Sequence, residues 1–192
     1  MKKLIIILAL IIAPMMTFGQ EGGLFDKYEA NESVTSMVLT KKVFKMLAEL
    51  KINLDDPDAQ EMLDMAGNIT GLKVLTTGDK TVSAQMKSDV DRHLKSSALE
   101  ELMRIKDGSQ TANFYVKEGK DDNHVKELLM FVTGLKEMSG GDITINGEKR
   151  EFETVLLSLT GDIDLRQVSK LANKMDVPGG KHLEKAGDKN KN

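Results

Sequence analysis

The chain has 192 residues, of which 30% are charged and 4% aromatic, and its formal net charge is −3. It contains no cysteine, which excludes a disulfide scaffold and a lipid anchor attached to cysteine. The mildly acidic balance favours solubility and provides no basic face for phosphates, so we expect no nucleic-acid partner.

The N-terminal segment has the pattern of a secretory signal peptide. Two lysines precede an apolar run over 4–12, and Pro14 follows before the small residue Gly19. The run is about half of the roughly 20 residues that a membrane span requires. We therefore expect a signal peptide over 1–19, export to the periplasm or the outside of the cell, and no membrane span after cleavage. Losing two lysines and no acid changes the net charge from −3 to −5.

The remaining length suits one domain with an ordinary core. We expect a single α+β domain over 20–176 and a disordered tail over 177–192, because the closing residues are polar and offer little to bury. Methionine is frequent, whereas tryptophan is absent. Methionine fills irregular core space and also lines adaptable binding surfaces. Most methionines lie in phase with Val, Leu or Ile, which favours the core.

The first half of the mature chain alternates between the spacings of strands and helices. Alternating β-branched residues indicate strands, and the helical spacing of Val43, Met46 and Leu47 indicates one face of a helix. Asp56 is expected to cap a second helix, which Gly67 ends. The expected elements are a strand over 33–40, helices over 41–50 and 56–66, a strand over 71–77 and a helix over 81–95.

The second half is dominated by strands. The unbroken apolar run over 128–132 indicates burial on both faces, and glycine-rich turns bracket a surface hairpin within 134–150. The expected elements are strands over 99–106, 112–116, 125–133 and 152–160 and a closing helix over 165–175. The order β-α-α-β-α-β-β-β-β-α predicts an α+β fold, a mostly antiparallel sheet with helices packed on one face.

Two Thr-Gly-Asp segments, at 77–79 and 160–162, each follow an apolar strand and precede a helical pattern. Phosphate-binding loops are built in this way, because a helix N-terminus attracts anions. Here aspartates already occupy that position, and the further glycines and the ending of a phosphate loop are missing. We expect both glycine corners to start helices, with Asp164 capping the second, and we expect no cofactor.

Local signatures of metal binding and catalysis are weak. Asp89 and His93 share a helix face, but Asp91 points elsewhere, so we expect no metal site there. The acidic cluster over 53–58 lacks the central glycine and the terminal glutamate of a calcium loop. There is no G-x-S-x-G motif and no cysteine nucleophile, although a spatial Ser/His/acid set stays open. We expect a protein that is not an enzyme.

Phe25 and Tyr28 are two aromatic residues in an otherwise polar segment before the first strand. Rings of this size bury a large apolar surface, and we expect them to lie against the sheet and close one end of the core. Contact with a ligand or partner is the alternative. These two residues are the candidate site residues that the sequence offers.

Six segments together have the pattern of a known family. They are Phe25–Tyr28, Val34–Lys41, Phe44–Met46, Gly71–Leu75, Glu101–Asp107 and Leu159–Ile163. The chain resembles the DUF4252 family of exported proteins from Bacteroidetes-type bacteria, from about Phe25 to Met175, with a longer hairpin over 134–150. The resemblance implies export and a small α+β domain. The family is uncharacterised in activity, so no functional residues carry over, and its frequent gene neighbours, extracytoplasmic sigma factors, imply an envelope-signalling setting.

These features favour a non-enzymatic interaction module of the cell envelope, with an unknown envelope protein as its partner. A carrier of a small apolar ligand or lipid is the alternative, and a cryptic hydrolase is a third hypothesis. A deep dry cavity favours the carrier, whereas an exposed apolar patch favours the interaction module. A convergent Ser, His and acid favours the hydrolase.

Overall fold

The computed structural model describes residues 23–49, 57–137, 142–145 and 148–174. The expected signal peptide over 1–19, the expected cap Asp56 and the expected tail over 177–192 lie outside these residues. The elements are α2 (Asp26–Glu29), β1 (Val34–Thr40), α3 (Lys41–Glu49), α4 (Pro57–Asn68), β2 (Ile69–Thr77), α5 (Lys80–Ser96), β3 (Glu100–Asp107), β4 (Gln110–Glu118), β5 (His124–Thr133), the 3-10 helix η1 (Leu135–Glu137), β6 (Asp142–Ile145), β7 (Glu148–Glu151), β8 (Thr154–Asp164) and α6 (Leu165–Lys174).

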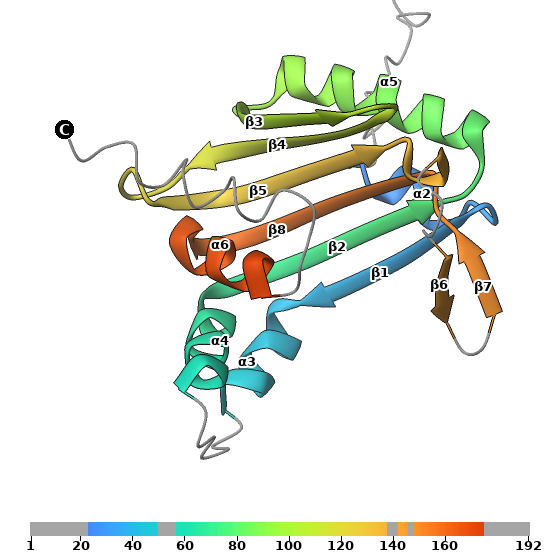
Figure 1. Cartoon of the computed structure of the whole chain (residues 1–192). Coiled ribbons are helices and arrows are strands. Elements are labelled where there is room, and N and C mark those ends of the chain that lie inside the picture. Colours follow the sequence, from blue (N-terminus) through green and yellow to red (C-terminus); the bar gives the residue numbers. More distant parts are fainter. Residues whose placement is uncertain (1–22, 50–56, 138–141, 146–147, 175–192) are drawn as a thin grey trace, which may run out of the picture.

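Six strands form one antiparallel sheet in the order β1-β2-β8-β5-β4-β3 (Figure 1). The last strand, β8, lies in the middle and joins the β1–β2 pair to the β3–β4–β5 meander. Strands β6 and β7 form the predicted hairpin as a separate two-stranded sheet. The α+β fold class and the mostly antiparallel sheet are therefore confirmed. The predicted elements occur in the predicted order, and the short helices α2 and η1 are additional.

A core layer lies on each face of the sheet. Leu129 and Phe131 of β5 pack with Met86 of α5 on one face. The alternate residues Leu128 and Val132 pack on the other face, in the layer that holds side chains of α3, α4 and α6. The apolar run of β5 is thus buried on both sides, as predicted. A strand that is apolar on both faces needs cover on both, so the helices lie against two faces of the sheet and not one (Figure 1).

The first Thr-Gly-Asp segment starts a helix, as predicted. Asp79 is the N-cap of α5, and its side chain accepts hydrogen bonds from the backbone N–H groups of Val82 and Thr81. These two bonds hold the pKa of the Asp79 carboxyl below its usual range. From this cap the helix buries Val82, Met86 and Val90 against the sheet.

The second Thr-Gly-Asp segment does not start a helix, and that prediction is wrong. Strand β8 continues through Gly161 to Asp164, and α6 begins at the next residue. Gly161 has a φ of 148° at the end of the β2–β8 ladder, where the register shifts. A Cβ on Gly161 would lie 2.3 Å from the carbonyl oxygen of Asn68, so the close approach of this backbone requires glycine. The cap prediction is confirmed, because Asp164 accepts a hydrogen bond from the N–H of Arg166.

Candidate functional site

Phe25 and Tyr28 are both buried, with 7% and 2% of their surface exposed. They belong to the core layer between α2, α5 and the sheet, together with Leu75 and Leu156. The rings therefore close one end of the core, which was the first of the two interpretations. Tyr28 reaches a ligand or partner only if α2 moves away from α5.

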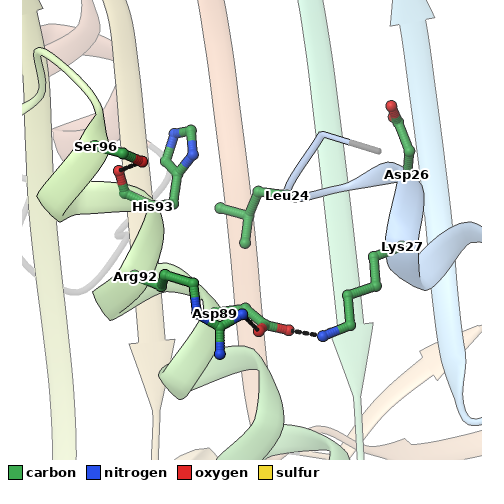
Figure 2. A pocket seen from close by; sticks show the side chains of 7 residues that line it. All are labelled: Leu24, Asp26, Lys27, Asp89, Arg92, His93 and Ser96. Carbon is green, nitrogen blue, oxygen red and sulfur yellow. Dashed lines mark hydrogen bonds and ion pairs between the residues drawn. The ribbon is translucent and has the colours of Figure 1, made fainter. Parts of the chain in front are cut away.

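A buried carboxylate, that of Asp89, fastens α2 to α5 (Figure 2). It forms an ion pair with Lys27, and it accepts hydrogen bonds from the Tyr28 hydroxyl at 2.6 Å and from Arg92 at 3.0 Å. Burial disfavours the charged carboxylate, but the hydrogen bonds from Lys27 and Tyr28 outweigh it and lower the pKa of Asp89. Burial and the bond to Asp89 raise the pKa of Tyr28.

Asp89, Asp91 and His93, the possible metal ligands on α5, make different contacts. Asp89 is occupied by three donors, and Asp91 pairs with Lys87 at 2.7 Å on the exposed side of the helix. His93 instead lines a hollow beside Leu24, which lies just before α2 (Figure 2). The part of the chain that the structure describes contains no group of three or more side chains suited to hold a metal ion. Asp89 acts here as a structural group.

A hollow of about 430 Å³ lies beside β1 and the residues that precede α2. It brings together His93, Glu127 and Ser158, the residue types of a hydrolytic triad. However, Ser158 donates its hydroxyl hydrogen directly to Glu127 at 2.9 Å, whereas in a triad the histidine stands between the serine and the acid. Lys73, paired with Asp26 at 2.7 Å, also lines the hollow. Charged groups of this kind are unlike the dry cavity expected of a lipid carrier.

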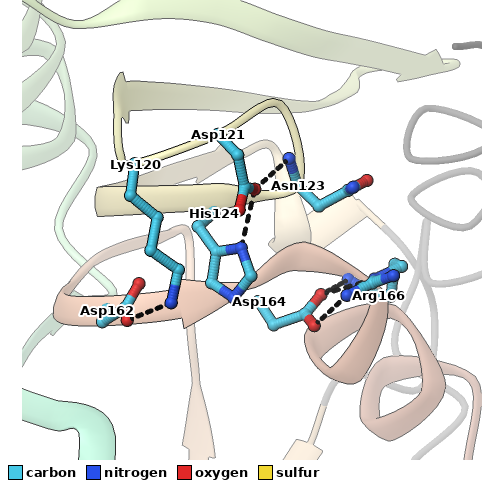
Figure 3. Close-up of polar contacts among 7 residues, drawn as sticks. All are labelled: Lys120, Asp121, Asn123, His124, Asp162, Asp164 and Arg166. Carbon is cyan, nitrogen blue, oxygen red and sulfur yellow. Dashed lines mark hydrogen bonds and ion pairs between the residues drawn. The ribbon is translucent and has the colours of Figure 1, made fainter.

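The end of the sheet where β8 meets α6 carries three carboxylates, each with a cationic or imidazole partner (Figure 3). The pairs are Asp162–Lys120 at 2.6 Å, Asp164–Arg166 at 2.6 Å and Asp121–His124 at 2.7 Å. The hydrogen bonds from Arg166 and His124 lower the pKa values of Asp164 and Asp121. A phosphate at this end would have to displace a carboxylate from its partner, which opposes an anion site there.

Exposed apolar side chains gather on the edge strand β1 and on α3, which follows it. Met37 and Val38 of β1 are 46% and 43% exposed, and Met46 of α3 is 59% exposed. Among the described residues, all of the large hydrophobic side chains with this degree of exposure lie in one short stretch. We name them the β1–α3 surface: Met37, Val38, Val43, Met46 and Leu47. Met37 and Val38 are neighbours on a strand and therefore lie on opposite faces of the sheet at this edge. Grouped apolar exposure marks interaction sites, whereas isolated exposed residues are ordinary.

The sequence predicted the opposite for this stretch. Val43, Met46 and Leu47 were expected on the core face of their helix, but α3 buries Phe44 instead. The helix lies at the margin of the sheet (Figure 1). Of its broad apolar side, only Phe44 is therefore buried in the core. Met37 also stands on an edge strand and not in the core. The signal was available, because four apolar residues in five positions make an arc wider than one contact can bury.

The fold and this surface define a small α+β domain with one antiparallel sheet, a core layer on each face and an apolar edge. The model of the domain of unknown function DUF4252 matches residues 28–171, about three quarters of the chain, and the chain belongs to this family. No curated protein and no solved structure matches the chain. None of the helices in the described residues is both long enough and apolar enough to cross a bilayer.

Proposed function

We propose that the protein is a non-enzymatic interaction module of the cell envelope that binds its partner through the β1–α3 surface. The observation that carries this proposal is that, among the residues whose side chains the structure describes, the exposed large hydrophobic side chains are confined to residues 37–47. Such grouping is costly for a soluble protein unless another molecule covers it. The signal-peptide pattern over 1–19 supports the envelope as the setting.

The surface offers two kinds of contact at once. An edge strand presents backbone N–H and C=O groups to an incoming strand, and the neighbouring α3 supplies apolar side chains beside it. Strand addition combined with apolar anchors is a common mode of recognition between proteins. By contrast, Asp89, Asp162 and Asp164 already have partners, so these sites give less support to catalysis.

Photo-crosslinking in the living cell tests this proposal. A photoreactive side chain replaces Met46 on α3 in one variant and the exposed Lys106 on β3 in a control variant. We expect protein adducts from position 46 in the envelope fraction, and few or none from position 106. Absence of adducts at 46, or the same adducts from both positions, would contradict the proposal.

A carrier of a small apolar ligand or lipid is the alternative proposal. Its support is the hollow of about 430 Å³ beside β1, but Lys73 and Glu127 among the lining residues weaken it. Native mass spectrometry of protein purified from the cell separates the two. A retained lipid supports the carrier, whereas ligand-free protein supports the interaction module.

A further inference from the structure

We propose that the β1–α3 surface binds a second copy of this chain, through antiparallel pairing of β1 with the β1 of the other copy. The inference rests on the proposed function, since it names the occupant of the same surface. The two six-stranded sheets then join into one continuous sheet across a two-fold axis. A closed two-fold contact of this kind uses the same surface on both copies.

The outer edge of β1 is open and regular. All seven of its residues pair with β2 without a register shift, and within the described residues no strand pairs with its other side. The strand sequence VTSMVLT contains neither a charge nor a proline. Charges, prolines and bulges are the usual means of blocking an edge strand, and β1 has none of them.

One antiparallel register uses the whole strand. With Met37 on the two-fold axis, each residue of β1 faces a residue of the same strand in the other copy. The facing pairs are Val34 with Thr40, Thr35 with Leu39, Ser36 with Val38, and Met37 with its own counterpart. No two charged residues face each other. In the two outer pairs, Val34 with Thr40 and Thr35 with Leu39, both side chains are β-branched or leucine, which is a favourable cross-strand arrangement.

The charges that flank β1 select this orientation. Glu32 precedes the strand, whereas Lys41 and Lys42 follow it in the first turn of α3, and all three are exposed. Antiparallel pairing brings Glu32 of each copy near the two lysines of the other, so the attraction occurs twice. Parallel pairing would set acid beside acid and lysine beside lysine, which costs free energy. The strand is therefore complementary to itself in one orientation.

Cysteine crosslinking tests the contact directly, because the chain has no cysteine of its own. Facing residues of antiparallel strands have Cα atoms about 4.5–5.5 Å apart, within disulfide reach. Met37→Cys is expected to form a covalent dimer on mild oxidation at least tenfold faster than Lys106→Cys, the control on the exposed strand β3. Equal rates at the two positions would overturn the proposal.

The register has its own test. Thr35→Cys and Leu39→Cys are expected to crosslink when the two variants are mixed, and far more slowly when each is oxidised alone. In the proposed register residue 35 lies four residues away from its own counterpart, about 13 Å along the strand. Rapid crosslinking of Thr35→Cys with itself would contradict the proposed register, in which Met37 lies on the two-fold axis.

Sedimentation velocity of protein expressed from the full-length sequence measures the equilibrium. We expect a dimer whose Kd rises at least tenfold in Met37→Lys, since two lysines then meet on the axis. Glu32→Lys is expected to weaken the dimer, and adding Lys41→Glu with Lys42→Glu to restore it. Because Met37 is exposed in the single chain, we expect its substitution to leave the fold intact, and thermal unfolding of each variant checks this. If a variant does not fold, the rates of cysteine crosslinking test the proposal instead.

The outcomes separate this inference from the proposed function. A monomeric protein that still gives adducts with another protein at position 46 overturns self-pairing and leaves the interaction module in place. A monomeric protein without such adducts overturns both. A terminal segment of the same chain that covers β1 would also give a monomer, and it would also overturn self-pairing.

Discussion

The two edges of the main sheet differ in the features that control strand pairing. Edge strand β1 is uncharged, regular and bordered by an apolar helix. Edge strand β3 carries charges at five of its eight positions, and its register shifts between Glu101 and Met103. Charged side chains and bulges discourage the addition of a further strand.

Only one of the two sheet edges is therefore left open to a further strand. Both strands end the same sheet and present the same unpaired backbone groups, yet only β3 carries the protective features. The composition of the chain does not force this contrast, since charged residues are plentiful at 30%. An unprotected edge beside an exposed apolar helix is therefore best explained as a binding surface.

The largest expected effect compares a buried methionine with an exposed one. Met86 of α5 is fully buried, whereas Met46 of the β1–α3 surface is 59% exposed. We expect Met86→Ala to lower the free energy of unfolding by about 3 kcal/mol, and Met46→Ala by less than about 0.5 kcal/mol. Urea unfolding of the two variants at low protein concentration measures both. A large cost at Met46 would mean that α3 is packed within its own chain, and the contrast between the edges would weaken.

A second effect concerns the attachment of α2, the helix that leads into β1. Asp89→Asn removes the charge that Lys27 and Arg92 contact, and we expect the free energy of unfolding at neutral pH to fall by about 2 kcal/mol. Asp91→Asn on the same helix is the matched control, because its pair with Lys87 is exposed and is worth less than about 0.5 kcal/mol. Equal effects of the two variants would show that the Asp89 contacts do not hold α2.

The same variant has a predictable dependence on pH. Because the pKa of Asp89 is lowered in the folded protein, its contribution is complete above the ordinary value of 3.8 and disappears as the pH falls through the lowered value. The stability difference between the original protein and Asp89→Asn should therefore shrink on acidification. Denaturant titrations at pH 7, 5 and about 3 measure it, and a difference that grows in acid would contradict the assignment.

The smallest expected effect on stability comes from removing charged side chains that discourage strand pairing at β3. Arg104→Thr with Lys106→Thr should change the free energy of unfolding by less than about 1 kcal/mol, since both side chains are exposed. We expect the double variant to form larger assemblies in sedimentation experiments, because two of the five charges that protect this edge are then removed. If it associates no more than the original protein, the charges of Arg104 and Lys106 are not what keeps β3 unpaired.

Local patterns predicted the elements well. The helix expected over 81–95 spans Lys80–Ser96, and the strand expected over 125–133 spans His124–Thr133. These elements follow from the 3.6-residue and two-residue periods of the side chains and from a cap such as Asp79, all of which act within a few residues. The signal peptide, the tail and the envelope setting stay predictions.

The candidate site was predicted less well, for a physical reason. The stripe of Val43, Met46 and Leu47 is identical in pattern to a core stripe, and only the position of α3 beside an edge strand leaves it exposed. The sequence predicted that Phe25 and Tyr28 lie against the sheet. It gave no sign of the buried carboxylate that binds Tyr28, because Asp89 lies some 60 residues further along the chain. A pairing over that distance has no local signal.

The two Thr-Gly-Asp segments show where local information ends. The amino-acid order alone decides that an aspartate caps the helix beyond each segment, because capping needs only neighbouring N–H groups. Whether the glycine forms the corner itself depends on the rest of the protein. At Gly161 the backbone of Asn68 passes so close that a side chain would clash, and β8 continues through this glycine to Asp164. This close approach exists only once β2 has paired with β8.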